Sequence, residues 1–449
     1  MLASDKSLKL ITGLFVLGLV ASETTFAGPR DTAFRIHQRY AGVPPTSAVL
    51  DQMEALVIAN NLEGAARIAM ANPGFSNIIL RTFFSTWSNR ELNPDVALND
   101  TILTLIGLVR DGRDFRGALY EDIICHVNQN LWFDNFTNNS LPQDPTIRVV
   151  RQPRADRNDH FFDAEERGID LHNPNEVVCS PQSVYTATVF NGTDNGAPVA
   201  RPYAAQRIEQ ILASEAAGIQ TTRGFGEAFF TAGTNRRGFA FIIQNFFGAG
   251  VLGMDGVHDT SLPDFLVRRD VPRDPSGNSL IFRNKCVGCH ANMDGNTGAY
   301  AYWNFGNSLV HGRRDGTNDP ASQVLVVDGK MNRNANVFPG GHEVIDNSWT
   351  NLMTQGINAP RFQFRVPASG QNVTNGVGAK SLGEVLANAR LFSESLAKRV
   401  FNKVCFRNPT ANSPEETAFN QMIDNFEATG YDVRNLFATS ASFCLANLD

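Results

Sequence analysis

Two cysteines and a histidine, at Cys286-Val-Gly-Cys289-His290, have the spacing of a covalent attachment site for haem c. Thiols three residues apart lie on one face of a helix, where both can add to the vinyl groups of one haem. The imidazole of His290 then lies under the ring and can bind the iron. We therefore predict one covalent haem c, bound by Cys286, Cys289 and His290, with His290 as the proximal iron ligand.

Two other uses of this motif are less well supported by its surroundings. A structural zinc site would need a second pair of cysteines or histidines at similar spacing, but the remaining cysteines are isolated: Cys125, Cys179, Cys405 and Cys444. A redox dithiol would favour a βαβ setting, whereas the sequence just before Cys286 is typical of the end of a short helix. Haem c is favoured over both.

The second axial ligand must come from the opposite face of the haem, usually as Met or His. Met293 follows His290 by three residues and would lie on the same side of the ring, so it is a poor choice. Met331 is the preferred distal ligand because it lies in a loop rich in Gly, Asn and Pro that can cross a haem face. His342 in the same loop and Met353, on a helix expected from about Asn347, are alternatives, as is an open position.

Aromatic and basic residues flank the motif and have two possible roles each. The aromatic group can pack against the porphyrin edge or serve equally well as ordinary core: Tyr300, Tyr302, Trp303 and Phe305. The arginines can reach the haem propionates or remain solvated at the surface: Arg268, Arg269 and Arg273.

The first 27 residues have the features of a secretory signal peptide. Lys6 and Lys9 precede a twelve-residue apolar stretch, Leu10 to Ala21, and small residues at Thr25 and Ala27 suit a cleavage site before Gly28. An uncleaved anchor helix is the alternative. Haem c is attached after export, so we predict a periplasmic or extracellular protein, with no transmembrane span expected after cleavage.

Charge and cysteine content are consistent with an exported protein. The net charge of −6 over 449 residues argues against nucleic acid as a partner. The four cysteines outside the motif suggest two disulfides in an oxidising compartment. Cys405 and Cys444 share the terminal helical region, which leaves Cys125 with Cys179 as the default pair, although three connectivities are possible.

The predicted fold is mainly α, with several helical subdomains around a cytochrome c-like haem domain and a long irregular excursion. Ser47, after Pro44-Pro45, is expected to cap a helix through Val57, and a helix is expected over 115–127. The predicted divisions are a signal peptide (1–27), an N-terminal helical domain (28–133), a loop-rich segment (134–200), a helical segment (201–264), the haem domain (265–370) and a C-terminal helical domain (371–449).

The region from about 265 to the C-terminus resembles the multi-domain cytochrome c proteins found in planctomycetes, myxobacteria and marine proteobacteria. The resemblance lies in Arg268-Arg269-Asp270-Val271-Pro272-Arg273, in the motif with Met293-Asp294 after it, in Gly298 to Trp303, in Val327-Asp328-Gly329, and in Leu396 to Cys405 and Gly430 to Phe443. Gly295-Asn296 departs from it, since related motifs often have Pro-Leu there. The resemblance implies a mainly helical, exported haem protein.

The leading functional hypothesis is electron transfer by an exported monohaem cytochrome, whose partner is a redox protein or a small-molecule electron donor or acceptor. A peroxidase-type enzyme is an alternative that would need an open distal position and a nearby acid–base residue. A binding protein with structural or sensory haem is a third, because a small haem domain alone suffices to carry one electron.

Overall fold

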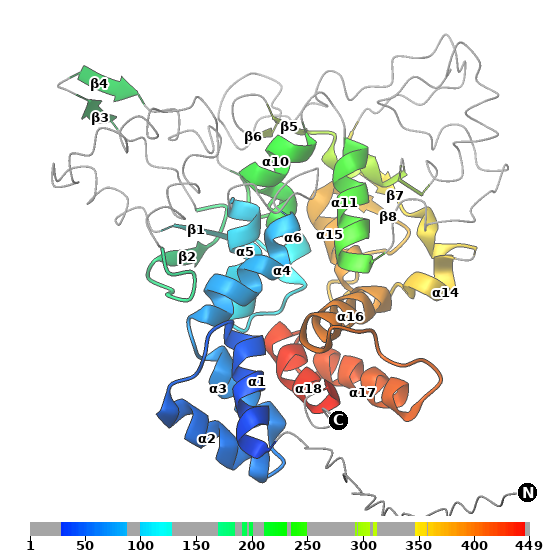
Figure 1. Ribbon diagram of the computed structural model, residues 1–449. Coiled ribbons are helices and arrows are strands. Elements are labelled where there is room, and N and C mark those ends of the chain that lie inside the picture. The colour runs from blue at the N-terminus through cyan, green and yellow to red at the C-terminus, as the bar shows by residue number, and fades with distance from the viewer. Residues whose placement is uncertain are drawn as a thin grey trace, which may run out of the picture.

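The computed structural model describes residues 28–87, 99–127, 169–184, 191–194, 197–200, 211–230, 235–248, 292–293, 295–305, 309–311, 346–356 and 358–444. These parts of the chain are mainly helical, which confirms the predicted fold class at that level (Figure 1). The short strands among them pair antiparallel in two-stranded sheets.

The N-terminal end is built from α1 (Pro29–Ala41), α2 (Ser47–Ile58) and α3 (Leu62–Met70). Pro29 lies at the first helical position of α1, and Gly42 ends that helix with a φ of 70°, which glycine adopts without strain. The cap of α2 is Thr46 rather than Ser47: Thr46 is extended and its side chain accepts a hydrogen bond from the Val49 amide. The predicted helix is therefore correct and its predicted cap is wrong by one residue.

The centre of the molecule contains a helix that is buried along its whole length, α5 (Asp100–Arg110). Asn99 caps it by accepting from the Ile102 amide at 3.2 Å. Shorter turns surround it: η1 (Phe75–Leu80, a π-helix), α4 (Arg81–Phe84), η2 (Ser85–Trp87) and α6 (Gly117–Tyr120). Aromatic rings fill the space between α4, η2 and α5, with Phe84 stacked against Phe115 at 5.9 Å.

The predicted helix over 115–127 is wrong in its second half, where β1 (Ile124–Val127) pairs with β2 (Val177–Ser180). Consecutive β-branched residues precede Cys125, and the Cys125 amide donates to Thr104 Oγ1 at 2.9 Å instead of a helical carbonyl. Cys125 and Cys179 are direct partners in the register and form a disulfide, which confirms the default pairing.

Gly107 on α5 lies against this disulfide, and we expect Gly107→Ala to destabilise the protein by about 2 kcal/mol. A methyl group there would lie 2.4 Å from the Cys125 sulfur and 2.5 Å from the Cys179 sulfur. Alanine normally gains about 1 kcal/mol over glycine inside a helix, so the overlap must outweigh the helix propensity. The shift of the chemical-denaturation midpoint measures the net effect.

A double-mutant cycle isolates this contact. In a Cys125→Ala/Cys179→Ala background both sulfurs are gone, so the further change Gly107→Ala should be neutral or mildly stabilising. A higher midpoint for Gly107→Ala in the native background would show that the close contact does not exist.

The remaining described elements lead from the centre to the C-terminus. The helices are η4 (Gly218–Thr221), α10 (Arg223–Phe229), α11 (Asn235–Phe247), η10 (Gly298–Tyr300), η11 (Leu352–Thr354), α14 (Asn358–Phe362), α15 (Gly378–Ala387), α16 (Arg390–Cys405), α17 (Pro414–Ala428) and α18 (Val433–Cys444). The strands are β3 (Asn191–Asp194), β4 (Ala197–Ala200), β5 (Trp303–Phe305), β6 (Leu309–His311), β7 (Ser348–Thr350) and β8 (Asn375–Val377).

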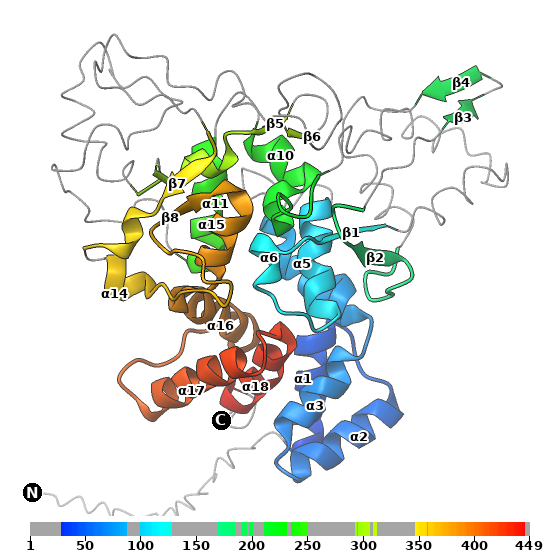
Figure 2. The same cartoon turned by 180° about the vertical axis from the view of Figure 1, so that it is seen from behind.

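The N-terminal and C-terminal helices share one hydrophobic core, with α1 and α3 beside α18 in both views (Figures 1 and 2). Tyr40 donates its hydroxyl hydrogen to the Phe437 carbonyl at 2.6 Å, across nearly the whole chain. The Phe437 ring lies 5.3 Å from Phe75 and 5.9 Å from Phe83. The two ends of the sequence therefore stabilise one another.

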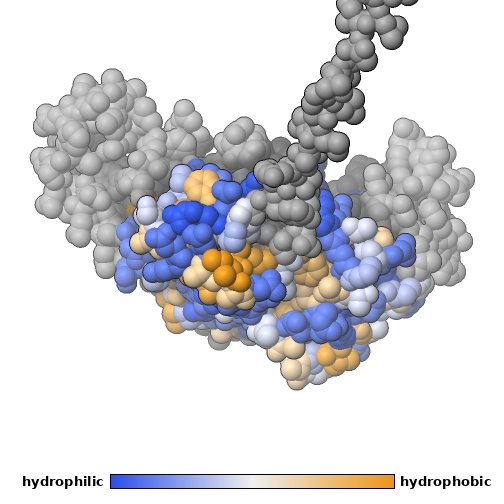
Figure 3. Space-filling model, turned by 60° about the horizontal axis from the view of Figure 1, so that its bottom comes forward, coloured by the Kyte–Doolittle hydropathy of each residue, from blue (hydrophilic) through white to orange (hydrophobic). Residues whose placement is uncertain are grey.

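A second disulfide, Cys405–Cys444, joins the last turns of α16 and α18 and confirms the other predicted pair. The end of the molecule formed by α1–α3, α17 and α18 has a mostly hydrophilic surface with separate apolar patches (Figure 3). Across the described helices, none combines the length and the apolar composition that crossing a bilayer requires.

Candidate functional site

The predicted haem ligands lie outside the described residues: Cys286, Cys289, His290, Met331 and His342. The described chain resumes at Asn292, two residues after the end of the motif. Met293, the methionine judged a poor distal ligand, lies inside the described part, is 7% exposed and belongs to the hydrophobic core.

Disulfide pairing leaves the two motif thiols without a partner among the other cysteines. Cys125 pairs with Cys179 and Cys405 with Cys444, so all four are used. The thiols of Cys286 and Cys289 are thus left to each other or to a ligand. A haem attachment site requires two thiols that are not used in other disulfides, because thioether formation consumes two reduced thiols.

The helical turn after the motif packs tightly against β7 at Gly295. A side chain at this position would place its Cβ 2.4 Å from the Thr350 carbonyl oxygen, so glycine is required by close approach of the two backbones. The contact with Thr350 gives the glycine at this position a physical reason.

Tyr300, at the end of η10, anchors the same segment to the centre of the molecule. Its hydroxyl donates a short hydrogen bond to the side-chain oxygen of Gln220. The Gln220 amide nitrogen donates to the Leu119 carbonyl, and more weakly to the Ala379 carbonyl at 3.5 Å. Burial raises the pKa of Tyr300, so the hydroxyl stays protonated and remains a donor. Through Gln220, the chain following the motif is held by α6 and α15.

Two of the aromatic residues after the motif, Tyr300 and Trp303, belong to the hydrophobic core. Tyr300 lies 5.6 Å from Phe230, and Trp303 stacks on the same ring at 6.5 Å. Both are almost fully buried. Tyr302 is half-buried, and burial is the main cause of its raised pKa. The arginines Arg268, Arg269 and Arg273 lie outside the described residues.

Met353 is completely buried, but not on the helix predicted from about Asn347. Ser348–Thr350 forms β7, paired with β8, and a single 3-10 turn at Leu352–Thr354 follows. Trp349 explains the difference: its ring packs over Gly376 on the partner strand and its indole nitrogen donates to Ser381 at 2.8 Å. Met353 serves as core packing beside the segment that contacts Gly295.

Asn296 provides a test of whether these residues suit a haem. It is fully buried, its amide nitrogen donates to the Asn292 carbonyl at 2.9 Å, and its side-chain oxygen accepts no hydrogen bond within the described chain. Leaving a buried acceptor unused costs about 1–3 kcal/mol. An iron-bound imidazole has a second ring N–H that needs an acceptor, and Asn296 follows His290 by six residues. The two thiols, the imidazole and this acceptor fit a haem c.

Other metal chemistry finds no support in the part of the chain that the structure describes, where no three His, Cys, Asp or Glu side chains are grouped to hold an ion. Comparisons with protein-family models, with curated proteins and with solved structures find no match to this chain.

Proposed function

We propose that this protein is an exported monohaem c-type cytochrome that transfers electrons through a covalently bound haem. The observation that carries the proposal is the motif Cys286-Val-Gly-Cys289-His290. The pairing of the other four cysteines with one another supports it, because it leaves both motif thiols available. When bound, the haem would supply a one-electron couple at iron.

The chain would hold the haem in three ways. Cys286 and Cys289 would form thioethers to the two vinyl groups, and His290 would bind the iron from one side. The unused oxygen of Asn296 would accept from the second nitrogen of that imidazole, fixing the ring's orientation. The contacts of Gly295 and Tyr300 with the helical body support a haem segment attached to a rigid scaffold.

Two disulfides are consistent with maturation in an oxidising compartment. Together with the basic and apolar pattern of residues 1–27, they support a signal peptide and a periplasmic or extracellular location. The partner would be a redox protein or a small-molecule electron donor or acceptor. The resemblance to multi-domain bacterial cytochromes points to the same class.

Absorption spectra of the purified protein test the function. A ferric low-spin, six-coordinate spectrum that does not change with peroxide, and a ferrous form silent to carbon monoxide, are expected of an electron carrier. A high-spin ferric spectrum that responds to peroxide would refute the carrier and support a peroxidase-type enzyme. Absence of a haem spectrum from protein matured with the cytochrome c export machinery would refute both.

The predicted distal ligand has a separate spectroscopic test. Met331→Leu should abolish the weak methionine-to-iron charge-transfer band of the ferric protein, because leucine has no sulfur to bind iron. Met353→Leu is the matched control, since Met353 is a buried core residue and leucine preserves its volume. Loss of the band in Met353→Leu, with retention in Met331→Leu, would mean that Met353 and not Met331 is the distal ligand.

A further inference from the structure

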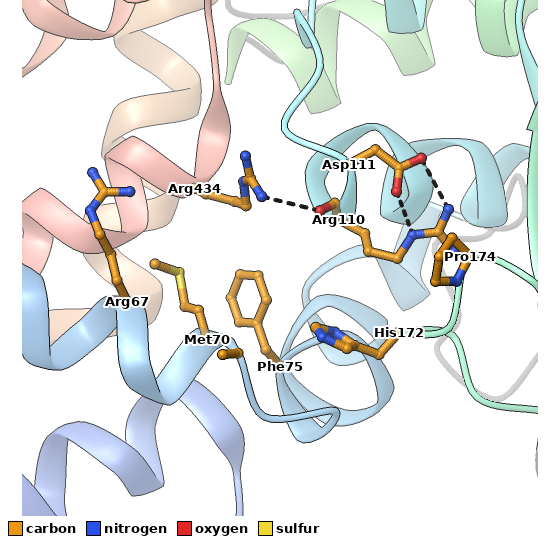
Figure 4. A pocket seen from close by; sticks show the side chains of 9 residues that line it. Arg67, Met70, Phe75, Arg110, Asp111, His172, Pro174 and Arg434 are labelled. Atoms are coloured by element: carbon orange, nitrogen blue, oxygen red, sulfur yellow. Dashed lines mark hydrogen bonds and ion pairs between the residues drawn. The ribbon is translucent and has the colours of Figure 1, made fainter. Parts of the chain in front are cut away.

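A cavity of about 400 Å³ lies where the N-terminal helices, α5 and α18 meet. It is lined by residues from five places in the fold: Arg67 and Met70 of α3, Phe75 of η1, Arg110 of α5, Arg434 of α18, and His172 from the segment before β2. Figure 4 shows Arg67 and Arg434 on one side, His172 on the other, and Met70 and Phe75 between them. Its volume is in the range of small-molecule sites, which are about 300–1,000 Å³.

Two of the three arginines in the wall are already neutralised. Arg110 is nearly buried and pairs with Asp111 through two hydrogen bonds, 2.7 and 3.0 Å long, while also donating to the Val177 carbonyl at 2.8 Å. Arg434 pairs with Asp432 at 3.0 Å and donates to the Arg110 carbonyl at 3.3 Å. These groups shape the wall and add little net charge.

Arg67 is different because its hydrogen-bond partner in the described chain is a neutral amide. It donates to the side-chain oxygen of Asn435 at 2.9 Å and forms no ion pair there. The remaining N–H groups of its guanidinium fork are available, and a guanidinium binds a carboxylate through two such groups. The wall therefore carries one unmatched positive charge.

The opposite wall is neutral and the floor is apolar. His172 Nδ1 lies 3.0 Å from Ser76 Oγ. Burial is the main cause of the lowered pKa of His172; Asp170 opposes it and Arg110 adds to it, so the ring is uncharged at neutral pH. Met70 and Phe75 line the cavity and are 7% and 1% exposed, so the floor is a small apolar surface formed by a thioether and an aromatic ring.

We propose that this cavity binds a small organic monoanion, a carboxylate with an aromatic or aliphatic body, and that Arg67 holds the carboxylate. One unmatched charge suits a monoanion better than a doubly charged phosphate ester. The apolar floor suits an organic body better than an inorganic ion. The site is independent of the haem motif and of the function proposed for it.

Isothermal titration calorimetry of the full mature chain at pH 7 tests the proposal with 3-phenylpropionate as the probe. We expect a dissociation constant of about 0.1–1 mM, typical of a fragment-sized ligand. The uncharged analogue 3-phenylpropanol should bind at least about tenfold more weakly, because it cannot pair with the guanidinium. Inorganic phosphate should also bind at least about tenfold more weakly, because it has no apolar body.

Arg67→Gln should weaken 3-phenylpropionate binding about tenfold or more while leaving the circular dichroism spectrum unchanged, since Arg67 is exposed on α3. Arg35→Gln is the matched control: Arg35 is exposed on α1, outside the cavity lining, and its replacement should leave binding unchanged. The proposal is overturned by no binding of the probe, by equal binding of the alcohol, by tighter binding of phosphate, or by unchanged affinity in Arg67→Gln.

Discussion

Cys289→Ser should lower the amount of covalently attached haem about tenfold or more, the largest functional effect expected of a single substitution in this chain. Serine cannot form a thioether, so one of the two bonds between protein and porphyrin is lost. Any haem that remains attached through Cys286 should keep one unreacted vinyl group. Haem staining after denaturing electrophoresis measures the loss. The pyridine haemochrome spectrum of the haem that remains attached should shift to longer wavelength.

Val287→Ala is the control for this experiment. It lies between the two cysteines but changes neither a thiol nor the imidazole, so haem attachment should remain close to that of the unaltered protein. Undiminished haem staining in Cys289→Ser would refute the attachment site. It would also remove the basis of the proposed electron-transfer function, because every other argument for haem depends on this motif.

Phe437→Ala should destabilise the protein by about 3–5 kcal/mol, the largest stability effect we expect. Phe437 is completely buried, and its ring meets Tyr40, Phe75 and Phe83 in edge-to-face contacts. Truncation would leave a cavity where α18 packs on the N-terminal helices. Denaturant unfolding should show a lower midpoint, and limited proteolysis should cleave more readily within residues 29–70, because those helices lose their partner.

Phe406→Ala supplies a matched change of side chain in a different environment. Phe406 is 71% exposed, and its main contact is the Arg39 guanidinium, 4.8 Å from the ring centroid. Its removal should cost no more than about 1 kcal/mol. Equal losses for Phe406→Ala and Phe437→Ala would contradict the shared core of the two ends of the chain.

Much of the helical architecture could be predicted from local signals. The apolar period after Pro44-Pro45 corresponds to α2, and the region 371–449, predicted to be helical, contains α15 to α18. Capping and periodicity act within a few residues, so they can be read without knowing the fold. The small error at Ser47 shows the limit: two adjacent hydroxyl residues can both cap, and the backbone turn selects Thr46.

Strands were harder to predict, because their stability depends on partners elsewhere in the chain. The sequence predicts a helix through Ile124–Val127 and another that contains Met353. In the structure, β1 exists through its pairing with β2, and β7 through Trp349 and its partner strand β8. A strand's hydrogen bonds lie entirely outside the strand itself, so local propensity carries little information about them.

The sequence by itself determined three things: two thiols and an imidazole at the spacing from which we propose one haem, a mainly helical chain, and an even number of further cysteines. Only the tertiary structure decided which cysteines pair, why Gly295 must lack a side chain, and that Arg67, His172 and Arg434 line one cavity. The physical reason is distance along the chain. A motif of five residues acts through bonds and one helical turn, whereas a cavity is formed by packing that brings remote segments together.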